Sequence, residues 1–202
     1  VPFRINEVNS FYGGGKEGVS DTFGAALWCL DYMFELATYG CNGVNMETDV
    51  NQLGWISHYS PIVHDGQGNI SVRPEYYGML AFSLAGKGDL LKITLTKEDI
   101  NLTAYATRTK GGGDFVWVTI INKDLSRDAK VNINLPENYG EVTVFWLKAP
   151  SVQSRGQVTL AGSEVAADGS WSPRKPQHLT VKGHPASLVI PHCSAALLRF
   201  SH

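Results

Sequence analysis

The feature that most constrains this chain is a change in hydrophobic spacing near residue 89. Before that position, short apolar segments alternate with stretches whose apolar residues recur every three or four positions, which is helical spacing. After it, apolar residues recur every second position in many short segments, as in β-strands with one buried face. The spacing therefore predicts an α/β portion over residues 1–88 and an all-β portion over residues 89–202.

Two strand–helix units are predicted in the first portion. In order, they comprise a strand over Val1–Ile5, a helix between Phe23 and Gly40, a strand over Gly43–Met46 and a helix between Pro74 and Gly86. Ser20 or Asp21 is the expected N-cap of the first helix. This alternation is typical of a parallel sheet, but two units cannot close a parallel barrel. We therefore expect an incomplete domain whose remainder lies outside this chain.

The second portion is predicted to be an antiparallel β-sandwich. Turn segments rich in glycine, proline, aspartate and asparagine, such as Gly111–Gly113, separate its strands. The expected strands are Leu91–Leu95, Leu102–Ala106, Phe115–Ile121, Val131–Leu135, Val142–Leu147, Val158–Leu160, Leu179–Val181, Ala186–Ile190 and Ala195–Phe200.

Composition excludes several classes of partner. The formal net charge is −2, and the basic residues form no stripe interleaved with aromatics, so we expect no nucleic-acid partner. No apolar run approaches the ~20 residues that span a bilayer, so we expect no membrane partner. The three cysteines and the histidines show no metal-ligand spacing, and we expect no metal and no cofactor. Sequons at Asn69 and Asn101 favour a secreted protein.

The candidate chemistry lies just after the first strand. Glu7 sits where a parallel strand ends, which is where barrel enzymes gather catalytic groups. Asn6 and Asn9 bring amides that could hold a carboxylate or a sugar hydroxyl, and Tyr12 adds a phenol. Gly13–Gly15 permit a sharp turn that points backbone N–H groups at an anion. The residues alone leave two interpretations open, an acidic nucleophile beside an anion-binding turn and an ordinary solvated loop.

The stretch RINEVNSFYGGGKEGVSDTFGAALWCLDYMFELATYG resembles the nucleophile segment of glycoside hydrolase family 79, which contains β-glucuronidases and heparanases. Later segments agree in order, namely GVN at Gly43, YSPI at Tyr59, RPEYYGML at Arg73 and SAALLRF near the C-terminus. The Asn6–Glu7 pair also resembles the acid/base pair of related barrels. The residues after Glu7 match the nucleophile segment, and one further strand–helix unit precedes the sandwich, so the nucleophile role is favoured.

The resemblance implies a C-terminal portion of an enzyme. Residues 1–88 would be the last two βα units of a (β/α)8 TIM barrel, and residues 89–202 its C-terminal β-sandwich domain. Glu7 would be the nucleophile, Tyr12, Gly13 and Gly14 would bind the uronate carboxylate, and Tyr59 would contact the sugar. Retaining hydrolysis needs a second carboxylate, which this resemblance places upstream of residue 1. We therefore expect this chain alone to be inactive and to need the missing N-terminal portion as its partner.

The predicted function is that of a retaining exo-β-glucuronidase acting on glucuronic-acid-containing glycans. Heparanase-like endo-cleavage is the nearest alternative, and the net charge disfavours it because a polysulfated chain favours a basic cleft. Family members often carry a histidine where this chain has Glu47, which bears on sugar specificity. A different class of answer is a non-catalytic carbohydrate-binding or structural β-sandwich fragment, with Trp117, Trp146 and Trp171 as a sugar platform.

Overall fold

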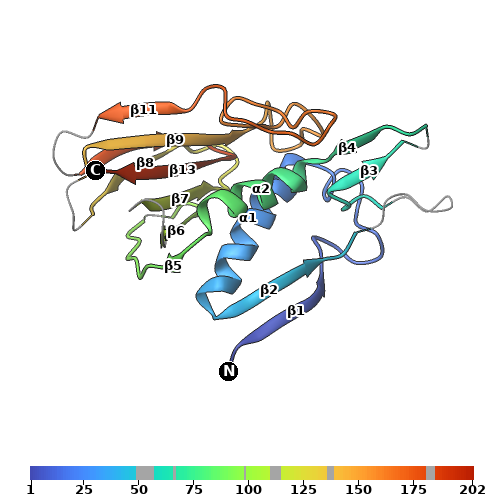
Figure 1. Ribbon diagram of the computed structural model, residues 1–202, viewed down its shortest axis with the longest axis horizontal. Coiled ribbons are helices and arrows are strands. Elements are labelled where there is room, and N and C mark those ends of the chain that lie inside the picture. Colours follow the sequence, from blue (N-terminus) through green and yellow to red (C-terminus); the bar gives the residue numbers. More distant parts are fainter. Residues whose placement is uncertain (49–56, 66, 98, 110–114, 136–138, 181–184) are drawn as a thin grey trace.

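The computed structural model describes residues 1–48, 57–65, 67–97, 99–109, 115–135, 139–180 and 185–202. Within these residues, two helices lie between a pair of parallel strands and a larger antiparallel sheet (Figure 1). The elements are β1 (Phe3–Val8), α1 (Phe23–Thr38), β2 (Cys41–Met46), β3 (Ile62–His64), β4 (Ile70–Val72), α2 (Pro74–Ala85), β5 (Asp89–Leu90), β6 (Leu102–Arg108), β7 (Val116–Asn122), β8 (Ala129–Ile133), β9 (Glu141–Lys148), β10 (Thr159–Leu160), β11 (Gln177–Thr180), β12 (Ala186–Ile190) and β13 (Ser194–Ser201).

The predicted order of strand, helix, strand and helix is confirmed in the first portion. β1 and β2 pair in parallel, and α1 connects them. The predicted end of the first strand at Ile5 is wrong, because β1 continues to Val8, which pairs with Met46. Glu7 therefore lies within the strand and not beyond it. An antiparallel hairpin of β3 and β4, which the sequence analysis did not predict, lies between β2 and α2 in the chain.

The start of α1 is fixed by the second portion of the chain. Its N-cap is Thr22, and neither Ser20 nor Asp21 caps it as predicted. The backbone N–H groups of Phe23 and Gly24 instead donate to the carbonyl oxygens of Ser154 and Val152, at 2.8 and 2.9 Å. Since the first N–H groups of a helix have no partner inside it, these distant carbonyls do the work of a cap.

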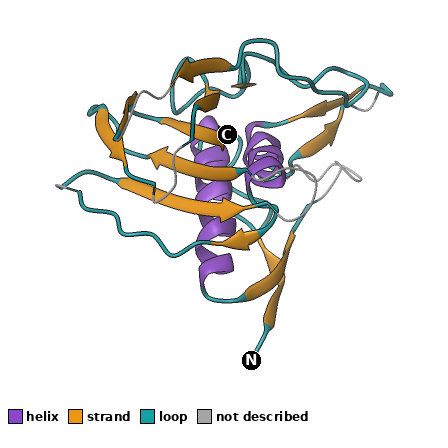
Figure 2. Ribbon diagram, turned by 60° about the vertical axis from the view of Figure 1, so that its left-hand side comes forward, coloured by secondary structure: helices purple, strands orange, loops and turns teal. Residues whose placement is uncertain are grey.

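The two helices pack closely through a glycine. A Cβ atom at Gly78 of α2 would lie 2.3 Å from the Ala26 carbonyl oxygen of α1 and 3.0 Å from the Cys29 Cβ, so only glycine permits this approach. Figure 2 shows both helices lying across the face of the large sheet. Their apolar sides form one core cluster with that sheet, in which Phe34 stacks on Tyr105 at 5.0 Å.

Antiparallel β-structure after residue 89 is confirmed. The large sheet has seven strands in the order β10–β9–β13–β7–β6–β5, with β11 paired to β9. A two-stranded sheet of β12 and β8 packs on its other face through a second core cluster. The two sheets are unequal, and each face of the large sheet has its own apolar cover, helices on one side and strands on the other.

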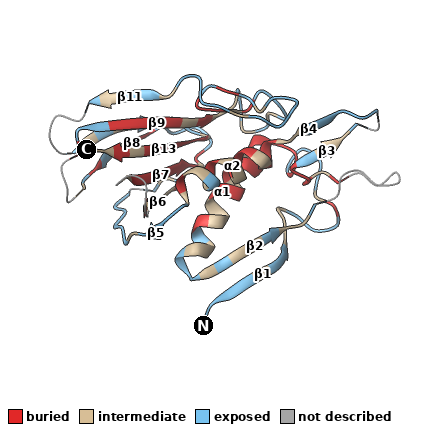
Figure 3. Cartoon of the chain, viewed as in Figure 1, coloured by how far each residue is buried: buried red, intermediate tan, exposed pale blue. Residues whose placement is uncertain are grey.

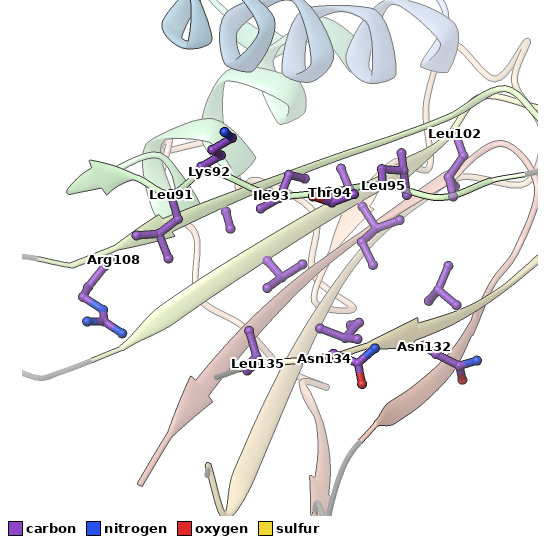
Figure 4. A pocket seen from close by; sticks show the side chains of 16 residues that line it. Leu91, Lys92, Ile93, Thr94, Leu95, Leu102, Arg108, Asn132, Asn134 and Leu135 are labelled. Atoms are coloured by element: carbon purple, nitrogen blue, oxygen red, sulfur yellow. The ribbon is translucent and has the colours of Figure 1, made fainter. Parts of the chain in front are cut away.

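One predicted strand does not form. Only Asp89 and Leu90 pair, as β5, whereas Leu91–Leu95 is extended but makes no strand with the described residues. The side chains of this segment line a cavity of about 710 Å³ between it and strands β6, β7 and β8 (Figure 4). The Leu91 N–H still donates to the Ala106 carbonyl of β6 at 2.9 Å, but the strand assignment ends at Leu90. Alternating apolar residues indicate a buried face, and that pattern alone does not make a strand. The predicted turn Gly111–Gly113 and the predicted strand end at Val181 lie outside the described residues.

Candidate active site

Four of the five predicted site residues line one cavity at the ends of β1 and β2. Glu7, Tyr12, Gly13 and Tyr59 surround a space of about 310 Å³, and Val8, Asn9, Phe11 and Glu47 complete its described lining. The fifth residue, Gly14, supports the cavity through its backbone. The fold thus brings together residues that are far apart in the chain, from Glu7 to Tyr59.

The glycine turn forms one wall of the cavity. Gly13, Gly14 and Gly15 have φ angles of 60°, 87° and 88°, a left-handed run that other residues rarely adopt. The Gly14 carbonyl accepts the N–H groups of His58 and Tyr59, at 2.6 and 3.4 Å, and the Gly15 N–H donates to the Tyr12 carbonyl at 3.2 Å. Within the described residues, the N–H groups of Gly13 and Gly14 donate no backbone hydrogen bond. Gly13 is exposed and lines the cavity, whereas Gly14 is buried and does not line it, so the Gly13 N–H is the one open to an anion there.

A second set of contacts stabilises the segment that carries Tyr59. Its side chain is only 5% exposed, although it contributes to the cavity lining. The Arg73 guanidinium donates to the Ser57 carbonyl oxygen, and the hydroxyls of Ser57 and Ser60 lie 2.6 Å apart. Burial lowers the pKa of Arg73, with the Asp21 carboxylate opposing this shift. These hydrogen bonds therefore fix the segment from which Tyr59 reaches the cavity.

Asn9 joins the ends of the two parallel strands. Its Nδ2 atom donates to the Glu47 carbonyl oxygen at 2.7 Å, and the Glu47 N–H donates to the Val8 carbonyl at 2.8 Å. The Asn9 Oδ1 atom accepts the Ser10 N–H at 2.6 Å. These bonds go to backbone, and whether the amide also meets a sugar hydroxyl stays a prediction. Their effect is to hold Glu47 beside the end of β1, where it lines the cavity.

The rim of the cavity carries an aromatic pair. Tyr12 is 85% exposed and Phe11 43% exposed, and their rings stack with centroids 5.3 Å apart. Phe11 was not singled out from the sequence, although an aromatic residue directly before Tyr12 is a signal that could have identified it. The exposed phenol and the glycine N–H groups belong to the same turn, and their binding of an anion stays a prediction.

The charges of the lining are acidic. Glu7 and Glu47 are its ionisable carboxylates, and no lysine, arginine or histidine is among the described residues that line it. Nor does the described part of the chain contain a group of three or more histidine, cysteine, aspartate or glutamate residues able to hold a metal ion. Within this described lining, a phenol and backbone N–H groups are the donors suited to a sugar carboxylate.

The predicted tryptophan platform is wrong. Trp117 is 8% exposed and packs on Phe145 in the core shared with the helices. Trp171 packs against the same core and donates to the Leu160 carbonyl oxygen at 3.3 Å. Trp146 packs against the other core cluster, where Lys148 lies over its ring. The three rings therefore do not share one surface.

Comparison with curated proteins shows similarity to β-glucuronidases. One of *Aspergillus niger* is 28% identical over 137 residues, which is 66% of this chain, and one of *Neurospora crassa* is 35% identical over 80 residues, which is 40% of this chain. The matched regions span 22% and 14% of those two relatives. No protein-family model matches the chain. The predicted resemblance to β-glucuronidases is confirmed, and the family number stays a prediction.

Solved structures share the fold over almost the whole chain. A 4-O-α-L-rhamnosyl-β-D-glucuronidase of *Fusarium oxysporum* has a TM-score of 0.75 at 22% identity, covering 98% of this chain and 43% of that one. An α-L-arabinofuranosidase of *Thermotoga petrophila* has a TM-score of 0.73 at 14% identity, covering 97% and 42%. Both describe glycoside hydrolases, and at these identities the likeness concerns the fold. Neither helix in the described part of this chain has the length and apolar character that a bilayer crossing needs.

Proposed function

We propose that this chain is the C-terminal portion of a retaining exo-β-glucuronidase in which Glu7 is the nucleophile. The observation that carries the proposal is that Glu7, Tyr12, Gly13 and Tyr59 line one cavity at the end of a parallel strand. Similarity to β-glucuronidases supports the sugar class. Residues 1–88 are then the last two βα units of a (β/α)8 barrel, and residues 89–202 are its C-terminal β-sandwich.

In this mechanism the Glu7 carboxylate attacks the anomeric carbon and the bond to the leaving oxygen breaks. A second carboxylic acid, ~5–5.5 Å from the first, protonates that oxygen and then activates the water that hydrolyses the glycosyl-enzyme. We place this acid/base upstream of residue 1, as the family resemblance implies. The 202 residues alone should then not turn over substrate. Turnover by them would instead implicate Glu47, the other carboxylate of the cavity.

The sugar carboxylate is proposed to bind at the glycine turn. The Tyr12 phenol and the Gly13 N–H line the cavity and can donate to it, with the Gly14 N–H as the third proposed donor. Tyr59, whose N–H donates to the Gly14 carbonyl beside this turn, is proposed to contact the ring. Two carboxylates and no basic side chain in the described lining suit one uronate better than a polysulfated chain. This charge pattern favours an exo-acting glucuronidase over a heparanase-like endo-enzyme.

We also propose that the protein is secreted. The asparagines of both sequons, Asn69 and Asn101, are exposed, which glycosylation requires.

The experiment that tests the reaction follows the first product of the whole enzyme, with its upstream portion, by proton NMR. We expect a glucuronide-terminated oligosaccharide to release a monosaccharide whose anomeric proton is first that of the β-form. A first-formed α-anomer would show inversion and exclude a glycosyl-enzyme at Glu7. Release of internal oligosaccharides would favour the endo-acting alternative.

A further inference from the structure

A carboxyl group that the proposed reaction does not use lies buried at the start of α2. Glu75 is the second residue of that helix and is 0% exposed. Among the described residues, neither of its carboxylate oxygens has a hydrogen-bond partner of normal geometry. A glutamate in the first turn of a helix is ordinarily solvated and favoured by the helix dipole. An enclosed one without a partner is costly when charged and requires an explanation.

The surroundings of Glu75 come from α1 and from the site loop. Cys29 of α1 lies on this side of the helix pair, where a Cβ atom added at Gly78, one turn after Glu75, would lie 3.0 Å from the Cys29 Cβ. The Asn9 amide lies near the carboxyl from the direction of the cavity. Asn9 has two N–H donors, and the bond to the Glu47 carbonyl occupies one of them. The second N–H of the Asn9 amide can donate to a buried carboxyl oxygen of Glu75.

We propose that Glu75 is a positioning residue of the site, a neutral carboxylic acid that orients the Asn9 amide and thereby the ends of β1 and β2. The inference rests on the proposed function, since the groups positioned are Glu7 and Glu47, which both line the cavity. The Asn9 amide fixes Glu47 only in the orientation that directs Nδ2 at its carbonyl, and a carbonyl oxygen of Glu75 selects that orientation. Rotating the amide by half a turn would place two oxygens face to face.

The protonation of Glu75 agrees with this role. Burial raises its pKa to about 8, and the nearby Asn9 amide opposes the rise. The titratable group facing it from α1 is the Cys29 thiol, whose pKa is raised by burial first and by Glu75 second. Arg73, at the start of α2, donates to the Ser57 carbonyl. Near neutral pH the group is therefore a carboxylic acid, and at higher pH a negative charge forms next to the Asn9 amide.

The activity test uses Glu75→Gln and Glu75→Leu in the whole enzyme. Glutamine keeps a neutral acceptor oxygen, so we expect kcat/KM on an aryl glucuronide to stay within about threefold of the wild type below pH 7. Leucine removes the acceptor, and loosening the site should lower kcat by about 10- to 100-fold with a smaller change in KM. In an Asn9→Ala background, adding Glu75→Leu should lower kcat little further, because Glu75 acts on the site through the Asn9 amide. Equal activity of the leucine and glutamine variants, or full additivity with Asn9→Ala, would overturn the positioning role.

A second measurement needs no activity and covers the case in which Glu75→Leu does not fold. Because the pKa of Glu75 is raised in the folded state, its stabilising effect is present below the unfolded value and is lost as pH rises through about 8. The melting temperature of Glu75→Gln relative to wild type should therefore increase between pH 4.5 and 8 and level off above. Glu35→Gln, a carboxylate on α1 away from the site, is the matched control. A melting-temperature difference that stays constant across that window would contradict a neutral Glu75. Absence of glucuronide turnover by the wild type would overturn the proposed function and the positioning role, but it would leave the pH dependence of the melting temperature unaffected.

Discussion

Strands β1 and β7 are stabilised in different ways. All seven residues of β7 are buried, because helices cover one face of its sheet and β8 and β12 cover the other. Four of the six residues of β1 are exposed and none is buried (Figure 3). β7 is fixed by apolar packing, whereas the site end of β1 is fixed by polar bonds at its tip, through Asn9 and the glycine turn. β7 is therefore part of an apolar scaffold, whereas β1 carries the proposed chemistry.

The largest expected effect is on β1 and concerns activity alone. Glu7→Gln in the whole enzyme should lower kcat/KM on an aryl glucuronide by at least about 10⁴-fold, because the amide cannot form the glycosyl-enzyme. Its melting temperature should change little, since Glu7 is exposed. Glu17→Gln is the matched control, an exposed glutamate in an ion pair with Arg155. Turnover by Glu7→Gln close to that of the control would exclude the nucleophile role.

The scaffold should respond in the opposite way. Leu197 of β13 is fully buried between the large sheet and the helices, and Leu197→Ala should lower the free energy of unfolding by about 3 kcal/mol. Phe3→Ala on β1, where the ring is 39% exposed, should cost about 1 kcal/mol or less. Urea unfolding of the 202-residue chain compares the two. Equal losses would show that β1 is supported by packing as β7 is.

A smaller effect is expected at the rim of the site. Tyr12→Phe keeps the ring stacked on Phe11 but removes the phenol that is proposed to bind the uronate. We expect KM for an aryl glucuronide to rise about tenfold, the equivalent of one charge-assisted hydrogen bond, with kcat less affected. Tyr39→Phe, at the exposed end of α1, should leave KM unchanged. An unchanged KM in Tyr12→Phe would remove the phenol from carboxylate binding.

The smallest effect tests the junction of the two regions. The Tyr105 hydroxyl donates to Asp31 at 2.8 Å and to Glu35 at 3.1 Å, joining β6 to α1. Tyr105→Phe should destabilise the chain by about 1 kcal/mol, because Thr103 and Lys123 still bond to Asp31. Tyr32→Phe, whose ring stacks on Trp28, is the control. Thermal unfolding measures both, and a loss above that of a whole core side chain would mean that polar bonds dominate this junction.

Local patterns predicted much of the fold. Helical spacing and the stop at Gly40 identified α1, and the Pro74 start identified α2, because these signals lie within one or two turns. Long-range features escaped prediction. The carbonyls of Val152 and Ser154 cap α1 from more than a hundred residues away. The alternation at Leu91–Leu95 does not say whether a neighbouring strand is present.

The candidate site was predictable in part for the same reason. Glu7, Tyr12 and Gly13 are close in sequence, and their shared cavity follows from one strand end and one turn. A sequence motif predicted that Tyr59 lies at the site. The bond from Arg73 that stabilises the segment before Tyr59 was not predicted. Glu75 has the sequence signature of a solvated helix-start glutamate. Its burial depends on how α1 and α2 approach, which local sequence does not encode.

The most direct test of the account is to trap the glycosyl-enzyme. The whole enzyme is incubated with an activated 2-deoxy-2-fluoro-glucuronide, digested, and mapped by mass spectrometry. We predict one label, carried by Glu7, with protection by a competitive glucuronide inhibitor. A label on Glu47 or on any other residue would contradict the assignment of Glu7 as the nucleophile.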